Sequence, residues 1–324
     1  MIKKMTSKLK ILFVDSVHPI LPEKLSDAGF ICDYQPDIQD DQISKIIADY
    51  DGLIIRSKIK IDKQMIDNAL KLKFIGRVGA GLENIDVKYA EVKGIKCFNS
   101  PEGNRDAVGE HAVGMLISLL NNILKADREI RNGKWLREPN RGIELKNKTI
   151  GIIGYGNMGS AFAQRLKGFG ANVIAYDKYK FNYSDEFVTE KTLEDLFEQV
   201  DILSLHVPLT DETQFMVCDE FINKFKKDIY LINTARGKVL KTDDLVKNMK
   251  TGKVLGAALD VLEYEKTSFE SLHSDEKLPE SFEYLIKTDR VILTPHIAGW
   301  TNESNIKLSE FLGDKIIKAF ASFT

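Results

Sequence analysis

The glycine-rich run at residues 149–159 constrains the fold of this chain more than any other part of the sequence. It consists of T-I-G-I-I-G-Y-G-N-M-G, so a short apolar segment is followed at once by three closely spaced glycines. The apolar segment is typical of a buried strand, and residues 157–169 are typical of a helix. A strand, a tight glycine turn and a helix in this order predict a parallel α/β unit.

Short apolar segments alternate with helix-like segments on both sides of this run. Strands are predicted at residues 10–15, 32–35, 52–57, 74–79, 96–100, 149–153, 173–177, 202–207, 229–234, 254–260 and 291–294. This alternation predicts an α/β protein with two doubly wound parallel sheets. Between the two series, residues 106–132 contain no proline and predict one long helix that ends at Asn132 and Gly133. Residues 303–320 predict a closing amphipathic helix.

Composition narrows the class of protein. A chain of 324 residues with 43% hydrophobic content predicts two domains with a cleft between them. The 46 basic and 48 acidic residues nearly cancel, so we expect no nucleic-acid or membrane partner. The apolar residues 11–14 are too few for a signal peptide, which favours a soluble, cytoplasmic protein. The three cysteines are far apart and no His, Cys and carboxylate cluster has ligand spacing, so no metal site is expected.

The context of the three glycines predicts a dinucleotide site. Gly154 permits the tight turn, Gly156 lets the backbone approach a pyrophosphate, and Gly159 allows the helix to pack closely on the strand. Asp177 ends the next strand, where a carboxylate accepts hydrogen bonds from ribose hydroxyls and repels a 2′-phosphate, which favours NAD. The alternative is a structural turn with a solvated aspartate. Lys178 and Lys180 lie nearby and leave NADP open.

Ordered motifs over nearly the whole chain resemble the D-isomer-specific 2-hydroxyacid dehydrogenases, within them the D-3-phosphoglycerate dehydrogenase-like branch. The motifs are RVGAGL at 77–82 with NID at 84–86, PEGN at 101–104, the run 149–159, HVPLT at 206–210, NTARG at 233–237, LDV at 259–261 and PHIAG at 295–299. The resemblance implies a Rossmann NAD-binding domain at 105–296, inserted in a flavodoxin-like substrate domain formed by 1–104 plus 297–324. Only 28 residues follow His296, so no C-terminal regulatory domain is expected.

The resemblance also implies three catalytic residues, Arg236, Glu265 and His296. Reduction of a 2-keto acid needs a proton donor at the carbonyl oxygen, and histidine titrates in the useful range. A neighbouring Glu265 would orient the ring and favour its protonated form. Arg236 would pair with the substrate carboxylate through its fork of donors. Taken singly, each residue has a plain alternative: a turn arginine, a solvated carboxylate and a structural histidine.

Two departures from the family pattern affect this set. Lys266 follows Glu265 where the family commonly has proline, so Glu263 is the fallback partner. The stretch from Glu265 to His296 is longer than usual, and we interpret residues 268–287 as an added surface loop with a short helix. His111 is interpreted as a packed helix histidine, and His206 as lining the cofactor site without acting as an acid.

The resemblance further implies contacts to the cofactor and the substrate. The cofactor set is Gly154, Tyr155, Gly156, Asn157, Met158, Gly159, Asp177, His206, Val207, Pro208, Thr213, Thr234, Ala235, Arg236, Asp260, His296 and Gly299. The substrate set is Arg56, Ser57, Val78, Gly79, Ala80, Asn104, Arg236 and Trp300, with backbone N–H groups of 78–80 meeting the substrate carboxylate. A surface charge is an equal alternative for Arg56. Trp300 either limits substituent size at the substrate pocket or belongs to the core.

These observations predict an NAD-dependent enzyme that transfers hydride between nicotinamide and a small D-2-hydroxy acid or 2-keto acid, such as 3-phosphoglycerate, glyoxylate or hydroxypyruvate. Oxidation of formate or phosphite fits less well, because Arg56 and Asn104 suit a larger anion. A corepressor-like protein of the same fold that senses NAD(H) is the alternative from another functional class. The resemblance implies a homodimer joined through the nucleotide-binding domains.

Overall fold

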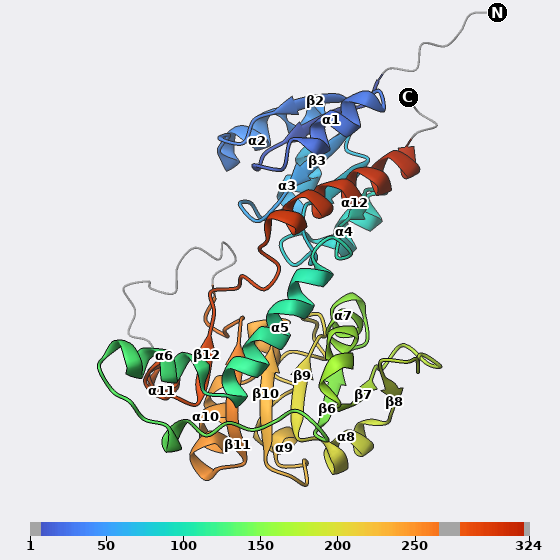
Figure 1. Ribbon diagram of the computed structural model, residues 1–324. Helices are drawn as coiled ribbons and strands as arrows, with labels where there is room; N and C mark the ends of the chain where they lie inside the picture. The colour runs from blue at the N-terminus through green and yellow to red at the C-terminus, as the bar shows by residue number, and fades with distance from the viewer. Residues whose placement is uncertain (1–7, 266–278, 321–324) are drawn as a thin grey trace, which may run out of the picture. The chain divides into compact units, whose positions relative to one another are not determined.

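The computed structural model describes residues 8–265 and 279–320 and divides the chain into two compact units (Figure 1). Unit 1 comprises Met1–Asn104 and Trp300–Thr324, and unit 2 comprises Arg105–Gly299. Unit 2 is therefore an insertion in the chain of unit 1. Each unit contains one parallel sheet, of five strands in unit 1 and seven in unit 2, with helices on both faces, which confirms the predicted α/β class.

Unit 1 has the strand order β2-β1-β3-β4-β5, the order of flavodoxin-like sheets. Its strands are β1 (Lys10–Phe13), β2 (Ile31–Tyr34), β3 (Gly52–Ile55), β4 (Phe74–Arg77) and β5 (Lys96–Phe98). Its helices are α1 (Ile20–Asp27), α2 (Asp40–Ile46), the 3-10 turn η1 (Ile47–Asp49), α3 (Lys63–Asn68), α4 (Val87–Val92) and α12 (Asn302–Phe320).

Successive residues of β1 point to opposite faces of this sheet and enter separate cores. Ile11 and Phe13 pack with residues of α1 and α12, such as Leu21 and Leu312. Leu12 packs with residues of α2 and α3 on the other face. The predicted closing amphipathic helix is α12, which packs Leu308, Leu312 and Ile316 against the sheet, while Ile306 and Phe311 are exposed.

Unit 2 has the strand order β12-β11-β10-β9-β6-β7-β8, which contains the Rossmann order with one added edge strand. Its strands are β6 (Thr149–Ile153), β7 (Asn172–Tyr176), β8 (Thr189–Glu190), β9 (Ile202–Leu205), β10 (Ile229–Asn233), β11 (Val254–Leu259) and β12 (Val291–Leu293). Its helical elements are α5 (Arg105–Leu120), α6 (Ile123–Arg131), η2 (Glu138–Asn140), α7 (Asn157–Leu166), η3 (Lys167–Phe169), α8 (Leu193–Gln199), α9 (Asp219–Ile222), η4 (Gly237–Val239), α10 (Thr242–Thr251) and α11 (Glu280–Lys287).

Two cores cover the two faces of this sheet. The first contains Leu231 of β10 with residues of α8 to α11. The second contains the next residue, Ile232, with residues of α5 and α7 such as Leu116 and Phe162. Burial on both faces explains why these strands are continuous apolar runs in the sequence.

The helix predicted at residues 106–132 is instead two helices, α5 and α6, bent by 63° at Asn121 and Asn122. Asn122 has φ 53°, a left-handed conformation that asparagine tolerates better than most residues. The predicted end is correct, because α6 stops at Arg131 and Gly133 has φ 74°. No single described helix is long and apolar enough to span a membrane, whereas α5 and α6 together pass that test by length and composition only.

Two further differences concern short segments. The strand β8 is only two residues long and was not predicted. The short helix expected within residues 268–287 is α11, while residues 266–278 of that segment lie outside the described residues.

Candidate active site

Three neighbouring strands of unit 2 end at the same level of the sheet. Asn233 of β10 pairs with Leu259 of β11, and Leu259 pairs with Leu293 of β12. Arg236, Glu265 and His296 follow these three strands in turn. Since ligands of open α/β sheets bind outside the carboxyl ends of the strands, the topology places all three predicted residues at the edge where a ligand is expected.

Glu265 and His296 form a direct pair. The Nδ1 atom of His296 lies 2.7 Å from Oε2 of Glu265, and both side chains are largely shielded, with exposed fractions of 24% and 17%. The second carboxylate oxygen of Glu265 accepts the N–H of Leu262, which fixes the carboxylate within its own turn. Glu263, the fallback, accepts the N–H of Thr242 at 2.9 Å, so Glu265 is the histidine partner.

The loop that carries His296 is anchored on Asp260, whose residue exposure is 1%. The carboxylate of Asp260 accepts the N–H groups of Ile297 and Ala298, each at 2.9 Å, and the hydroxyl of Thr294 at 2.6 Å. His296 itself has φ 56° and donates its N–H to the carbonyl of Asp260 at 2.8 Å. Asp260 was predicted as a cofactor contact, and in the structure its carboxylate bonds to the loop in which His296 has a left-handed backbone conformation.

His111 of α5 joins this anchor, which the sequence interpretation missed. Its Nε2 atom lies 3.2 Å from Oγ1 of Thr294 and 3.5 Å from Oδ1 of Asp260. Thr294 is 183 residues away along the chain, so no local pattern could have indicated the contact. His111 is a packed helix histidine as interpreted, and it also braces the loop that carries His296.

The backbone around Arg236 is fixed by the end of its own strand. The side chain of Asn233 donates to the carbonyl of Arg236 at 3.0 Å and accepts the N–H of Ala235 at 3.0 Å. A Cβ atom at Gly237 would lie 1.9 Å from the carbonyl oxygen of Leu262. Glycine is therefore required where the arginine loop crosses the turn that holds Glu265, and this contact couples the two loops.

The glycine-rich turn has the predicted geometry. Gly154 has φ 92°, and a Cβ atom there would lie 2.7 Å from the carbonyl oxygen of His206. A Cβ atom at Gly159 would lie 2.1 Å from the carbonyl oxygen of Gly154, so α7 packs against the end of β6 as only glycine allows. At Gly156 a Cβ atom would meet no described atom within 4 Å, which leaves open space before the first turn of α7. That space and the helix N-terminus suit a phosphate.

Asp177 is held in place by the backbone at the end of β7. Its Oδ2 accepts the N–H of Tyr155 at 2.8 Å, and its Oδ1 accepts the N–H groups of Tyr179 and Lys180 at 2.9 and 3.1 Å. The two nearby lysines have other partners, because Lys178 pairs with Glu212 at 2.8 Å and Lys180 donates to the carbonyl of Tyr155 at 2.8 Å. This arrangement supports NAD, since both lysines that could receive a 2′-phosphate are engaged.

Two buried polar atoms at neighbouring strand ends have no hydrogen-bond partner among the described residues: Nδ1 of His206 and Oγ1 of Thr234. Such atoms normally bond to a ligand or water. The other ring nitrogen of His206 lies 2.8 Å from Oγ of Ser204, and burial lowers the pKa of His206 to about 3. His206 is thus neutral near pH 7 and cannot act as an acid there, in keeping with its predicted role. These atoms and the open space at Gly156 fit a bound dinucleotide.

The remaining predicted cofactor residues lie on the same loops. Asn157 and Met158 form the first turn of α7, and Ala235 and Gly299 lie in the loops of Arg236 and His296. The buried ring of Tyr155 stacks on Tyr183 with centroids 5.0 Å apart. Val207 and Pro208 follow β9, and the hydroxyl of Thr213 donates to the carbonyl of Pro208 at 2.6 Å, so it organises this loop.

All predicted substrate residues except Arg236 lie in unit 1, and residues 56–57 and 78–80 follow strands β3 and β4 of its sheet. The carbonyl groups after β4 accept hydrogen bonds. The carbonyl of Gly79 accepts the N–H of Ser100 at 2.9 Å, and the carbonyl of Ala80 accepts the side-chain amide of Asn99 at 2.5 Å. Within the described residues the N–H groups of Gly79 and Ala80 donate to no acceptor. Val78 differs from the prediction, because its N–H donates to the carbonyl of Ile55 at 2.9 Å and extends the sheet.

Arg56 and Ser57 were predicted to end the strand 52–57 and instead follow β3 directly, and Asn104 is the last residue of unit 1 before α5. The guanidinium carbon of Arg56 lies 4.3 Å from the ring centroid of Trp300, and 67% of Trp300 is exposed. Trp300 is therefore outside the core, which removes the core alternative. The Oδ1 atom of Asn104 is buried without a partner among the described residues.

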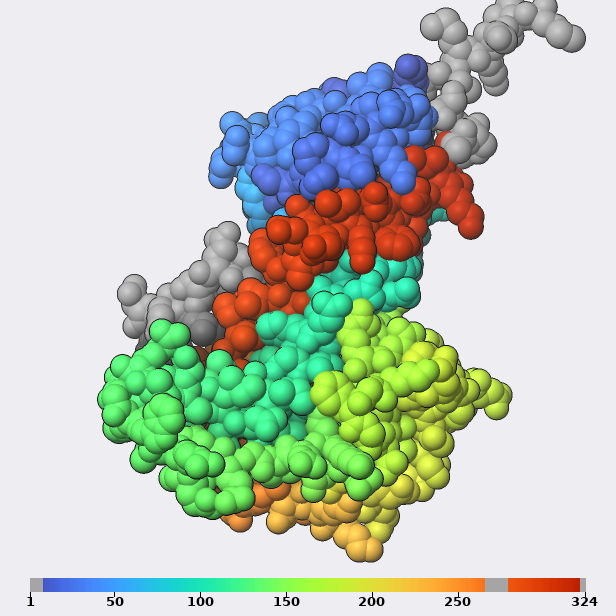
Figure 2. All heavy atoms as spheres, viewed as in Figure 1, coloured from blue at the N-terminus to red at the C-terminus, as the bar shows by residue number. Residues whose placement is uncertain are grey.

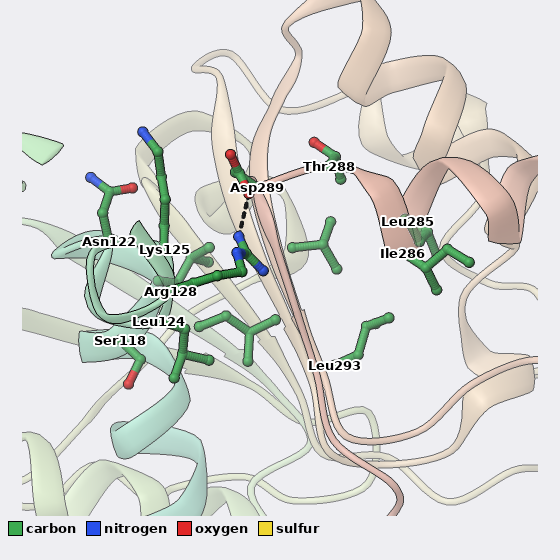
Figure 3. A pocket seen from close by; sticks show the side chains of 13 residues that line it. Ser118, Asn122, Leu124, Lys125, Arg128, Leu285, Ile286, Thr288, Asp289 and Leu293 are labelled. Carbon is green, nitrogen blue, oxygen red and sulfur yellow. Dashed lines mark hydrogen bonds and ion pairs between the residues drawn. The ribbon is translucent and has the colours of Figure 1, made fainter. Parts of the chain in front are cut away.

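A groove of about 330 Å³ lies elsewhere in unit 2, between α6, α11 and β12 (Figure 3). An ion pair between Arg128 and Asp289 crosses it, and Leu124 and Ile286 contribute apolar walls. None of the three predicted catalytic residues lines it. Within residues 8–265 and 279–320, no group of three or more His, Cys, Asp or Glu side chains could hold a metal ion.

Comparisons with known proteins agree with this architecture. The family model "D-isomer specific 2-hydroxyacid dehydrogenase, NAD binding domain" matches residues 113–298. The hydroxypyruvate reductase of Thermotoga maritima is 37% identical over 281 residues, which are 87% of this chain and 88% of that protein. The D-3-phosphoglycerate dehydrogenase of Archaeoglobus fulgidus is 32% identical over 311 residues, which are 95% of this chain and 57% of that longer protein.

Among solved structures, the D-lactate dehydrogenase of Aquifex aeolicus complexed with NAD and lactic acid has a TM-score of 0.81 and 28% identity, over 97% of this chain and 95% of that one. The matched family model covers more than half of the chain and includes the glycine-rich turn, Arg236, Glu265 and His296. The chain therefore belongs to the D-isomer specific 2-hydroxyacid dehydrogenase family and is an NAD-binding oxidoreductase.

Proposed function

We propose that this protein reduces a small 2-keto acid to the D-2-hydroxy acid, or catalyses the reverse reaction, with His296 as proton carrier. The observation that carries the proposal is the 2.7 Å contact between His296 and Glu265 beyond the ends of β11 and β12. An imidazole whose Nδ1 is held by a carboxylate presents Nε2 in a defined direction, the arrangement that general acid catalysis requires.

Each residue then has one role. His296 gives its proton to the carbonyl oxygen of the keto acid during reduction and takes it back from the hydroxyl during oxidation. Glu265 keeps the ring oriented through its contact with Nδ1. Arg236 pairs with the substrate carboxylate and stabilises the negative charge that develops on the oxygen. Asp260, Thr294 and His111 hold the loop on which His296 stands.

The predicted cofactor residues hold the dinucleotide. The first turn of α7 binds the pyrophosphate, Asp177 accepts ribose hydroxyls, and the unpaired atoms of His206 and Thr234 bond to polar groups of the bound cofactor. When bound, NADH supplies the hydride that reaches the keto carbon. The backbone N–H groups that fix Asp177 also keep its carboxylate pointing in one direction.

The substrate is proposed to carry a second anionic group, as 3-phosphoglycerate does. The N–H groups of Gly79 and Ala80 suit a carboxylate oxygen, and the Arg56 guanidinium suits a separate anion, with Ser57 and Asn104 as further contacts. Hydroxypyruvate and glyoxylate are smaller candidates that would use only the first of these groups. The predicted assignment of unit 1 as the substrate domain follows from the same residues.

We also propose a homodimer joined through unit 2. Several large apolar side chains on α6 and the segment after it are exposed: Ile123, Leu124, Ile130, Trp135, Leu136 and Ile143. Figure 2 shows this green segment running over the surface of unit 2. Apolar side chains gathered on one surface indicate a protein interface. Light scattering should give a dimer for the wild type and a smaller mass for a variant in which Trp135 and Ile130 are replaced by Glu.

One assay tests the catalytic proposal. Purified protein is mixed with NADH and a panel of 2-keto acids, and the loss of absorbance at the NADH band is followed. The proposal predicts turnover of at least one acid, and loss of that turnover in His296→Ala while NADH still binds. Tight NADH binding with no turnover by the wild type would support the NAD(H)-sensing alternative, and turnover that survives His296→Ala would exclude the proposed proton carrier.

A further inference from the structure

We propose that Trp300 is a positioning residue that holds the Arg56 guanidinium ready for an anionic group at the far end of the substrate. This inference rests on the function proposed above and names what that site selects: a 2-keto acid with a second anionic group. The observation is that the guanidinium carbon of Arg56 lies over the indole ring, 4.3 Å from its centroid, within unit 1.

Both backbone polar groups of Arg56, its N–H and its carbonyl, are hydrogen-bonded. Its N–H donates to the Asp15 carboxylate at 2.5 Å, and Asp15 is buried at the end of β1. Its carbonyl accepts Nε of Arg77 at 2.9 Å and the side chain of Asn84 at 3.4 Å. Three neighbouring strands, β1, β3 and β4, thus contribute to holding one residue.

The backbone next to Trp300 is also fixed by hydrogen bonds. Thr301 and Ser304 exchange hydrogen bonds, because each backbone N–H donates at 3.0 Å to the hydroxyl oxygen of the other residue. This reciprocal cap begins α12, whose buried residues Leu308 and Leu312 pack against the sheet. The indole lies one residue before the cap, so its position is set by the start of a long helix.

The guanidinium itself makes no hydrogen bond or ion pair to a side chain or carbonyl within the described residues, although it is half-buried. Burial lowers the pKa of Arg56, and the Asp15 carboxylate opposes this effect. A stacked guanidinium keeps its in-plane N–H groups directed outward from the ring, where they match two oxygens of a carboxylate or a phosphate. A fixed, partly desolvated cation with unused donors is what a selective anion site requires.

Arg56 and Trp300 therefore have different roles in the proposed anion site. Arg56 supplies the charge, and Trp300 limits the rotamers that the guanidinium can adopt and contributes a cation–π attraction. This differs from a role in limiting substituent size, since a size limit would depend on the volume of Trp300 and not on Arg56. The two roles therefore predict different results for substitutions at these positions.

The test uses two acids that differ by one phosphoryl group, 3-phosphohydroxypyruvate and hydroxypyruvate, with the full chain and saturating NADH. Trp300→Leu should raise KM for the phosphorylated acid about tenfold, while kcat and the KM for hydroxypyruvate change less than about twofold. Trp300→Phe, which keeps an aromatic face, should retain most of the preference. In Arg56→Met the preference should disappear, and adding Trp300→Leu to it should change little further.

If Trp300 only packed against its neighbours or limited the size of the substrate, the kinetic results would differ. Equal KM increases for both acids in Trp300→Leu, or an added loss in the double variant as large as in the single one, would overturn the proposal. So would faster turnover of bulky uncharged acids in Trp300→Leu regardless of residue 56.

A second measurement does not depend on turnover and separates this inference from the proposed function. The chain has two tryptophans, so Trp135→Phe leaves Trp300 as the only indole reporter. In that background, inorganic phosphate should change the fluorescence of Trp300, and Arg56→Met should abolish the response. If the wild type reduced no 2-keto acid, the proposed function would fail while this titration still decided whether the stacked pair binds an anion; absence of a response to phosphate would overturn the pair as an anion site.

Discussion

The residues proposed for proton transfer in unit 2 and those proposed for substrate binding in unit 1 are held in opposite ways. In unit 2, the carboxylates of Glu265 and Asp260 bond to His296 and to the backbone of its loop, so that other groups of the protein hold the proposed proton carrier in place. In unit 1, the carbonyls of Gly79 and Ala80 accept hydrogen bonds, while the N–H groups beside them and the guanidinium of Arg56 have no hydrogen-bond acceptor among the described residues. Hydrogen bonds within the protein fix geometry, whereas donors without a protein acceptor are available to a ligand.

This contrast predicts where substitutions act. Changes in the unit 2 network should lower kcat, because they disturb groups used in the chemical step. Changes in unit 1 should raise KM and leave kcat nearly unchanged, because they weaken binding that is the same in the ground and transition states.

After the loss of turnover expected for His296→Ala, the largest effect is expected for Glu265→Gln. The amide keeps a hydrogen-bonding group near Nδ1 of His296 but loses the negative charge, so kcat should fall about 100-fold, within the range of general acid–base contributions. Steady-state reduction of the best 2-keto acid measures this. Glu263→Gln is the matched control two residues earlier, and because its carboxylate caps α10 it should change kcat less than about threefold. Equal losses in both variants would show that the turn as a whole, and not the contact to His296, carries the effect.

The next largest loss of kcat is expected for Asp260→Asn. The amide nitrogen of the introduced asparagine cannot accept a hydrogen bond, so one backbone N–H of residues 297–298 would lose its acceptor. The free energy of unfolding should therefore fall by about 2 kcal/mol. We expect about a tenfold lower kcat with little change in KM. Chemical denaturation and steady-state kinetics on the same preparation measure both quantities.

An unchanged kcat in folded Asp260→Asn would mean that the left-handed position of His296 does not need the buried carboxylate. Thr294→Val and His111→Phe offer graded versions, since they remove neutral partners of the same anchor and should cost less.

The contrast also explains which parts of the molecule were predictable. The strands and the glycine turn follow from local periodicity and from contacts between residues close in sequence, such as Gly154 with Gly159. The break at Asn122 could not be predicted because asparagine fits both a helix interior and a left-handed position. The choice of Glu265 over Glu263 depends on one turn bonded to Leu262, and the contact between His111 and Thr294 spans 183 residues. Neither leaves a periodic signal.

On the unit 1 side, Gly79→Ala should raise KM by about fivefold, which corresponds to about 1 kcal/mol, and leave kcat unchanged. The added Cβ would lie 2.8 Å from Nη1 of Arg77, so Arg77 must move and weaken its 2.7 Å bond to the carbonyl of Gly81. The loop that presents the Gly79 and Ala80 N–H groups then becomes less ordered. Gly114→Ala in α5, where a Cβ atom meets nothing within 4 Å, is the control and should leave KM unchanged. A lower kcat in Gly79→Ala would contradict the proposed contrast between the units.

The smallest effect concerns pH and tests the neutral state of His206. Its folded pKa is lowered to about 3 by burial, whereas an unfolded histidine titrates near its ordinary value of 6.5. Between these values the unfolded chain binds the extra proton, so the stability that neutral His206 supports is present above pH 6.5 and is lost as the pH falls toward 3. Because the residue as a whole is only half-buried, we expect about 1 kcal/mol less unfolding free energy at pH 5 than at pH 7 from this group.

Urea unfolding of the wild type and of His206→Gln at both pH values isolates the contribution of His206, since the glutamine variant retains every other titrating group. The same pH dependence in both proteins would show that His206 already carries its extra proton in the folded state, which would contradict the neutral His206 described at the cofactor site.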